Sequence, residues 1–217
     1  MIRKILQTNI TYWSAYLILF SFVLIWTITH TKFEQMACVN HAVCHLGNAF
    51  FQMSSSLGEP LFFLSIIIAY LFIDYSKSLT LLLSLITSAL VVRILKLAFD
   101  TSRPKLYFKD VEYLWRFVPN ENVNIYNSFP SGHTTTSFLL FTSLALFNNN
   151  KKYSLVYLFF AIMTGFSRVY LFQHFPEDIL AGSVLGIFFA ILFYCFRQKT
   201  LIQNPVTPLK SYLFKKA

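Results

Sequence analysis

Three short polar stretches interrupt a largely apolar sequence, and they contain the residue types that phosphoryl chemistry needs. They are KLAFDTSRP at 96–104, PSGH at 130–133 and SRVYLFQHFPED at 167–178. Together they supply cations, a glycine-containing helix start, two histidines and a carboxylate. Such a set could bind a phosphate and transfer its phosphoryl group.

The cations are Lys96, Arg103 and Arg168. Three positive side chains around one point suit a phosphate, which carries a charge of about −1.5 to −2 near neutral pH. An arginine offers a planar fork of donors and keeps its proton, so it can hold a phosphoryl group in a fixed orientation. Alone, each cation could simply extend to lipid headgroups; the combination favours a phosphate site.

Ser131 and Gly132 precede an apolar run and are expected at the start of a helix. The backbone N–H groups at a helix start attract anions, and a glycine there lets a ligand approach the main chain closely. A lone PSGH would be weak evidence, because Pro-Ser-Gly is also ordinary turn-to-helix sequence.

The histidines supply the two roles that phosphoryl transfer requires, a nucleophile and an acid. His174 is followed four residues later by Asp178, which could hold one ring nitrogen protonated and leave the other free to attack phosphorus. His133 could then protonate the leaving oxygen. A single histidine near a membrane surface is more often structural, so this assignment depends on the whole set.

The complete pattern resembles the type 2 phosphatidic acid phosphatase superfamily. It consists of Lys, six residues, Arg-Pro, then Pro-Ser-Gly-His, then Ser-Arg, five residues, His, three residues and Asp, across 96–178. The resemblance implies that phosphate is bound by Lys96, Arg103, Ser131, Gly132 and Arg168. It also implies a phosphohistidine on His174, orientation of that ring by Asp178, and protonation of the leaving group by His133.

The same resemblance implies an enzyme that uses no metal ion or other cofactor. It further implies an all-α fold, a bundle of six transmembrane helices with the active site at the extracytoplasmic face. A related branch of the superfamily oxidises halides with vanadate, but its members are generally soluble, and the apolar runs of this sequence argue against that reading.

Composition independently predicts a polytopic membrane protein. The 217 residues are 56% hydrophobic and only 12% charged. Residues 11–29 and 179–196 are uncharged runs close to the ~20 residues that span a bilayer. Four shorter runs lengthen into polar or charged residues at one end. The expected spans are about 10–30, 57–75, 78–99, 132–148, 153–172 and 177–197.

The basic residues predict the orientation of these spans. If both termini are cytoplasmic, the inner segments hold ten of the 18 basic residues, as the positive-inside rule favours. All three polar stretches then lie on the extracytoplasmic side. The net charge of +9 is explained by topology and an anionic substrate, with no basic face for nucleic acid. The short loops favour a bacterial cytoplasmic (inner) membrane.

The sequence predicts one membrane domain, residues 1–200, and a basic cytoplasmic tail, residues 201–217. The longer connections, about 31–56 and 100–131, are expected as outer loops beside the site. Gly182, Gly186 and Ala190 recur every four residues and predict a close helix–helix contact.

Arg93 and Glu59 lie near the outer ends of their expected spans, and both are candidate substrate-binding residues. Arg93 precedes Lys96 by three residues, so both can face the site from one helix. One hypothesis is that Arg93 holds the diphosphate or headgroup of a lipid. The alternative is that it pairs with Glu59 or extends to lipid headgroups.

Cys38 and Cys44 in the first outer connection are expected to form a disulfide or to remain free thiols. A zinc site with His41 and His45 is the alternative, although the spacing matches no strong zinc pattern.

These features predict a metal-independent lipid phosphatase that acts through a phosphohistidine. The substrate is open among phosphatidic acid, phosphatidylglycerol phosphate, undecaprenyl diphosphate and lipid A. The outer segment 105–127 is the expected discriminator, since its aromatic and basic side chains can grip a headgroup. The alternatives are a lipid phosphotransferase with the same site, or a catalytically silent lipid-binding or transport protein.

Overall fold

The computed structural model describes residues 2–119 and 121–203, and this part of the chain is helical with no strand. The long helices are α2 (Ile10–Thr29), α5 (Pro60–Ile73), α6 (Tyr75–Phe99), α8 (Gly132–Phe147), α9 (Ser154–Tyr170) and α10 (Pro176–Gln203). The shorter ones are α1 (Ile2–Thr8), α3 (Lys32–His41), α4 (His45–Ser56), α7 (Pro104–Tyr107) and the 3-10 helix η1 (Lys151–Tyr153). Of the expected tail, residues 204–217 lie outside the described residues.

Each of the six predicted spans is a helix. Three stretches, those at 10–29, 75–107 and 176–200, are long and apolar enough to cross a membrane. Helices α4 and α5, bent by 51° at their junction, form a fourth if they count as one span. Helices α8 and α9, with 16 and 17 residues, are shorter. The helices are therefore confirmed, and six crossings remain a prediction.

Helix α8 occupies the centre of the bundle. Twelve of its 16 residues are buried, whereas α2 buries only Tyr12 and Trp13 of its 20. A helix enclosed by protein can carry threonines and serines because their hydroxyls bond back to the helix carbonyls, as Thr135 does to Ser131. The apolar outer face of α2 instead suits contact with lipid.

The segment 31–56, expected as a loop, forms helices α3 and α4. Thr31 and Glu34 make a capping box: the Thr31 hydroxyl accepts from the Glu34 amide, and the Glu34 carboxylate accepts from the Thr31 amide at 2.7 Å. Such reciprocal bonds satisfy free N–H groups at a helix start. The pattern T-x-x-E was present in the sequence, but no long apolar run accompanied it.

Helices α8 and α10 touch through glycine, as the four-residue repeat predicted. A Cβ atom on Gly182 would lie 2.7 Å from the Ser131 carbonyl oxygen, and one on Gly186 would lie 2.5 Å from that of Thr135. No larger side chain fits without moving a backbone. This contact fixes the start of α10 against the start of α8.

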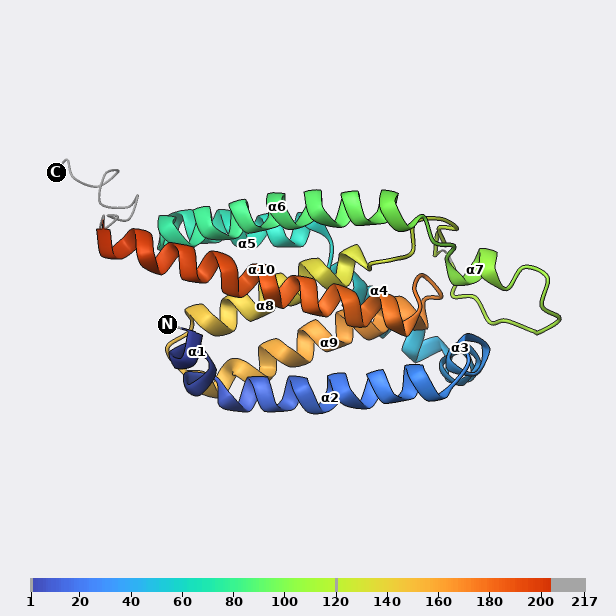
Figure 1. The fold of residues 1–217 in the computed structure, drawn as a ribbon. Coiled ribbons are helices and arrows are strands. Elements are labelled where there is room, and N and C mark those ends of the chain that lie inside the picture. The colour runs from blue at the N-terminus through green and yellow to red at the C-terminus, as the bar shows by residue number, and fades with distance from the viewer. Residues whose placement is uncertain (1, 120, 204–217) are drawn as a thin grey trace.

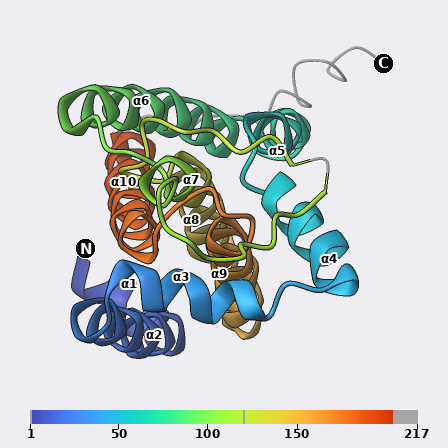
Figure 2. The ribbon, with the colours of Figure 1, turned by 90° about the vertical axis from the view of Figure 1, so that its right-hand side faces the viewer.

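The long helices run along one axis and connect at opposite ends of the bundle (Figure 1). Helix α1, the α5–α6 turn, the α8–α9 connection and the end of α10 lie at one end, where Arg197 bridges to Asp74 at 3.2 Å. Helices α3 and α7 lie at the other end. Figure 2 shows α7 and the long connection after it crossing the ends of the bundle helices.

Candidate active site

The three polar stretches converge at the end of the bundle that holds α3 and α7. Lys96 lies in the last turn of α6, and Arg103 immediately precedes α7. Ser131 caps α8, Arg168 lies in the last turn of α9, and Asp178 lies in the first turn of α10. His174 occupies the turn between α9 and α10. The predicted clustering on one side of the bundle is confirmed.

His174 is held by Asp178 in the buried interior. The Nδ1–H of His174 donates to Oδ2 of Asp178 at 3.2 Å, and each side chain is only 2% exposed. The same oxygen accepts from the Ser128 hydroxyl at 2.6 Å and from the Phe175 amide at 2.9 Å. A protonated Nδ1 leaves the lone pair on Nε2, the nitrogen needed for attack on phosphorus.

The surroundings also keep the His174 ring neutral. Burial lowers the pKa of His174 well below its ordinary value of 6.5, and the positive charges of Arg103, Arg168 and Lys96 lower it further. A neutral imidazole is the nucleophilic form. The cations that would bind phosphate therefore also favour the reactive state of the histidine.

Arg103 is fixed by backbone and side-chain acceptors. Its Nε donates to the Tyr126 carbonyl at 2.9 Å, and its Nη1 donates to Oε1 of Gln173 at 2.9 Å. Gln173 is buried and in turn donates from Nε2 to Glu121 and to the Asn122 carbonyl. The connection between α7 and α8 is thus bonded to Arg103 both directly, at Tyr126, and through Gln173.

Arg168 is almost fully buried and only partly satisfied. One of its terminal nitrogens donates to the Ser55 hydroxyl, while its Nε has no partner among the described residues. A buried, unpaired donor on a guanidinium is costly, and an anionic ligand would satisfy it. Lys96 donates to the Asn127 carbonyl, which holds the third cation at the same end.

The start of α8 provides fewer free backbone groups than expected. The Ser131 amide donates to the Asp178 carbonyl at 3.1 Å, and the Ser131 hydroxyl accepts from Thr134. The Gly132 amide has no hydrogen-bond partner among the described residues, as is usual in the first turn of a helix. Of the two predicted amides, Gly132 is the one available to an anion.

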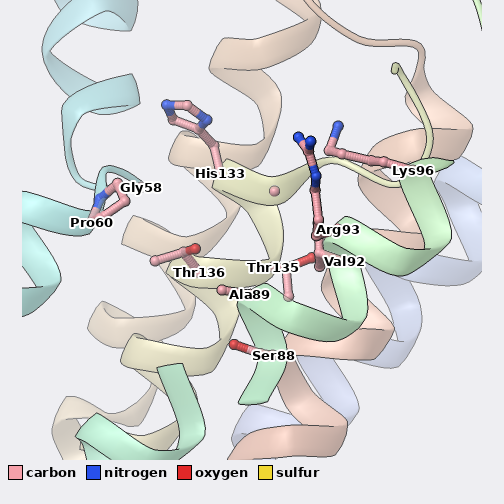
Figure 3. Close-up of a pocket in the computed structure, with 11 residues that line it drawn as sticks. Gly58, Pro60, Ser88, Ala89, Val92, Arg93, Lys96, His133, Thr135 and Thr136 are labelled. Carbon is pink, nitrogen blue, oxygen red and sulfur yellow. The ribbon is translucent and has the colours of Figure 1, made fainter. Parts of the chain in front are cut away.

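His133 lines a cavity of about 280 Å³ between α5, α6 and α8 (Figure 3). The α4–α5 turn packs beside it, since a Cβ on Gly58 would lie 3.0 Å from that of His133. Figure 3 shows Arg93 and Lys96 extending from α6 and His133 from the start of α8, and all three line this cavity.

Glu59, the other candidate substrate-binding residue, occupies the N-cap position of α5 without a side-chain capping hydrogen bond, and it is exposed. Among the described residues, no ion pair joins it to Arg93. The suggested Arg93–Glu59 pair is therefore wrong for this structure. Arg93 faces the cavity as the sequence hypothesis required.

Sequence reasoning missed the residues that support the site. They are Ser128, Gln173, Ser55 and Asn127, each of which bonds to a site side chain. Ser128 and Gln173 stand next to the motifs, at 128 before Phe129-Pro130 and at 173 before His174. The signal available in the sequence was that both are polar residues beside a motif. Ser55 and Asn127 carried no such signal.

Cys38 in α3 and Cys44 before α4 are free. Cys38 and Cys44 are both exposed, and the described residues hold no group of three or more metal-ligating side chains. His41 instead bonds through Nε2 to the Tyr113 hydroxyl at 3.0 Å. The disulfide and zinc alternatives are not formed in this structure.

The structure is a helical bundle with helices of membrane-spanning length, and it places a buried histidine–carboxylate pair close to three cations. The chain belongs to the PAP2 superfamily, whose family model matches residues 77–202. That range contains all three motifs, and the family assignment made from their spacing is confirmed.

Relatives with curated names match shorter parts of the chain. The lipid A 1-phosphatase of Rhizobium johnstonii is 33% identical over 109 residues, which cover 50% of this chain and 43% of that protein. The undecaprenyl-diphosphatase BcrC of Bacillus subtilis is 38% identical over 69 residues, covering 32% and 35%. The match spans less than half the length of either relative.

Two solved structures share the fold. The crystal structure of Aquifex aeolicus LpxE has a TM-score of 0.65 at 26% identity and covers 75% of this chain and 94% of that one. A PAP2 type phosphatidylglycerolphosphate phosphatase from Bacillus subtilis has a TM-score of 0.67 at 24% identity, covering 88% and 96%. The second likeness concerns the fold alone.

Proposed function

We propose that the protein is a metal-independent lipid phosphatase that hydrolyses a phosphomonoester or diphosphate on a membrane lipid. The observation that carries the proposal is the His174–Asp178 pair at 3.2 Å, beside an Arg168 whose buried Nε lacks a partner. The pair supplies an oriented neutral nucleophile, and the unpaired donor calls for an anion. A protein that only bound lipid would need the cations but not the oriented histidine.

The first chemical step forms a phosphohistidine. Nε2 of His174 attacks phosphorus while Lys96, Arg103 and Arg168 hold the phosphoryl oxygens, with Ser131 and the Gly132 amide at the helix start. The bond between phosphorus and the leaving oxygen breaks, and His133 donates its proton to that oxygen. Asp178 keeps Nδ1 protonated and offsets the positive charge that develops on the ring.

The second step releases phosphate. Water attacks the phosphorus of the phosphohistidine, the P–N bond breaks with its electron pair returning to Nε2, and His133 takes the proton from the water. Both histidines then return to their starting states. Transfer to a second lipid would follow the same course with a lipid hydroxyl in place of water.

The substrate class follows from the relatives and the site together. Lipid A, undecaprenyl diphosphate, phosphatidic acid and phosphatidylglycerol phosphate all present a terminal phosphoryl group, and relatives are named for lipid A and undecaprenyl diphosphate. The segment after Pro104 crosses the ends of the bundle helices (Figure 2), and in this proposal residues 105–127 read the headgroup.

We further propose a bacterial inner-membrane location with six crossings, cytoplasmic termini and an extracytoplasmic site. Basic residues gather at the end of the bundle opposite the site, as positive-inside topology favours: Lys77 at the start of α6, Lys151 and Lys152 in η1, and Arg197 in the last third of α10. Residues 1–200 would form the membrane domain and 201–217 a cytoplasmic tail. Labelling of single introduced cysteines by an impermeant reagent in intact cells would test this orientation.

The direct test is phosphate release by detergent-solubilised protein from the four lipid classes. Wild type should release phosphate from at least one of them without added metal and in the presence of a chelator. His174→Ala should abolish both release and an alkali-stable phosphoenzyme trapped with ³²P-labelled lipid. Full activity of His174→Ala or His133→Ala would overturn the mechanism, and label recovered in a second lipid would identify a phosphotransferase.

A further inference from the structure

Arg93 differs from the other cations near the site because the described residues leave its guanidinium unoccupied. Lys96, Arg103 and Arg168 each donate to a protein oxygen. Arg93 makes no hydrogen bond or ion pair to any described residue, although it lies within α6 between Val92 and Ile94. The Arg93 side chain is exposed near the end of α6, so its guanidinium is available to an anionic group of a ligand.

The position of Arg93 places it near the leaving group of the substrate, on the side of His133. Arg93 lines the same cavity as His133, with Lys96 and Gly132 at the boundary to the phosphoryl site, whereas His174, Arg103 and Arg168 do not line that cavity (Figure 3). In the proposed mechanism His133 protonates the leaving oxygen, so the leaving group lies on the His133 side. Arg93 therefore faces the part of the substrate that departs with the lipid.

The remaining lining of the cavity fits the first part of a lipid chain. Besides the three cationic or ionisable side chains it consists of small, apolar or hydroxyl residues: Gly58, Pro60, Ser88, Ala89, Val92, Gly132, Thr135 and Thr136. Its volume of about 280 Å³ is at the lower limit of ligand pockets, enough for a compact anionic group but too small for a whole lipid.

We infer that Arg93 binds the phosphate that remains on the lipid when a lipid diphosphate is cleaved. The inference rests on the proposed phosphatase function and narrows its substrate class to lipid diphosphates. His174 takes the terminal phosphoryl group, the P–O bond to the bridging oxygen breaks, and that oxygen leaves as part of the inner phosphate with the His133 proton. The Arg93 fork neutralises the charge that this inner phosphate carries.

A phosphomonoester lipid places no charge at the same point. Its leaving oxygen is bonded to carbon, so Arg93 has nothing to bind in the cavity. Arg93 should therefore discriminate between substrates that differ only in the inner phosphate, and it should also hold the monophosphate product.

The experiment compares wild type, Arg93→Gln and Arg93→Lys on farnesyl diphosphate and on dioleoyl phosphatidic acid in the same detergent. Arg93→Gln should lower kcat/KM for the diphosphate by about 10- to 100-fold and change that for phosphatidic acid by less than about threefold. Inhibition by farnesyl monophosphate should weaken by about tenfold. The kcat/KM of Arg93→Lys for the diphosphate should lie between those of wild type and Arg93→Gln, because lysine keeps the charge but lacks the planar fork of donors.

Lys152→Gln provides the matched control, since it removes an exposed cation at the opposite end of the bundle. It should leave activity on both substrates unchanged. Equal losses on the diphosphate and phosphatidic acid in Arg93→Gln, or unchanged product inhibition, would overturn the Arg93 inference alone. A wild-type enzyme that cleaves phosphatidic acid but not farnesyl diphosphate would also overturn the Arg93 inference alone. Release from no lipid by folded wild type would overturn the phosphatase function itself.

Discussion

The backbone carbonyl of Asp178 accepts a hydrogen bond from the Ser131 amide at 3.1 Å, which ties the start of α10 to the start of α8. The Asp178 side chain meanwhile orients His174. Asp178 therefore fixes the position of the nucleophile His174 relative to the helix start that contains His133. Two motifs separated by more than 40 residues are joined by the main chain as well as by side chains.

Asp178→Asn should keep this backbone contact and remove the carboxylate charge. The amide can still bond to Nδ1, but it can hold the wrong tautomer and cannot offset the developing positive charge. We expect kcat to fall by about 10²- to 10⁴-fold, as for other carboxylate–histidine pairs. Rapid-quench measurement of phosphoenzyme formation checks this, with thermal unfolding as the control for folding; a loss under threefold would contradict the orienting role.

Ser128→Ala removes the 2.6 Å hydrogen bond to Oδ2 of Asp178. Asp178 keeps its bonds from His174 and Phe175, so the carboxylate stays but is less firmly aimed. We expect kcat to fall by about 3- to 30-fold with KM nearly unchanged. Ser128→Thr retains a hydroxyl and should recover part of the loss; equal rates for Ser128→Ala and wild type would show that the contact has no part in catalysis.

Gln173 couples Arg103 to the connection between α7 and α8, because its Oε1 accepts from Arg103 and its Nε2 donates to Glu121 and to the Asn122 carbonyl. Gln173→Leu fills the same buried space but leaves Arg103 short of an acceptor. We expect KM for the lipid to rise by about 5- to 50-fold with a smaller change in kcat, because phosphate binding is mispositioned. A parallel fall in stability with no KM change would assign Gln173 to the fold alone.

The motif residues could be predicted because residue type and spacing carry their chemistry. Lys96, Arg103 and Arg168 are informative as a set, and alternation of apolar runs places them at one end. Ser55 could not be predicted, since its bond to Arg168 joins residues 113 apart and depends on how α4 packs on α9. Helices α3 and α4 were missed for a related reason: they are short and mixed in polarity, so hydropathy alone does not reveal them.

Gly186→Leu tests the packing on which the site depends. Even a Cβ at this position would meet the Thr135 carbonyl oxygen at 2.5 Å and the Leu139 amide nitrogen at 2.8 Å, both of them backbone atoms that cannot rotate away. We expect α10 to move away from α8, and the free energy of unfolding to fall by at least about 1–3 kcal/mol. Thermal unfolding in detergent measures this loss, and Val184→Leu, at an exposed position two residues from both contact glycines, serves as the control.

The pH dependence of phosphoenzyme formation should report the lowered pKa of His174. A lowered pKa keeps the ring neutral as the pH falls through 6.5, so the acidic limb assigned to His174 should have its midpoint below that value. Single-turnover rates between about pH 5 and 8, trapped in alkali, measure this limb. Arg103→Gln removes one of the cations that disfavour protonation, so its slower reaction should show the midpoint at higher pH. A wild-type midpoint above 6.5, or a shift to lower pH in Arg103→Gln, would contradict the electrostatic account of how the cations keep the nucleophile neutral.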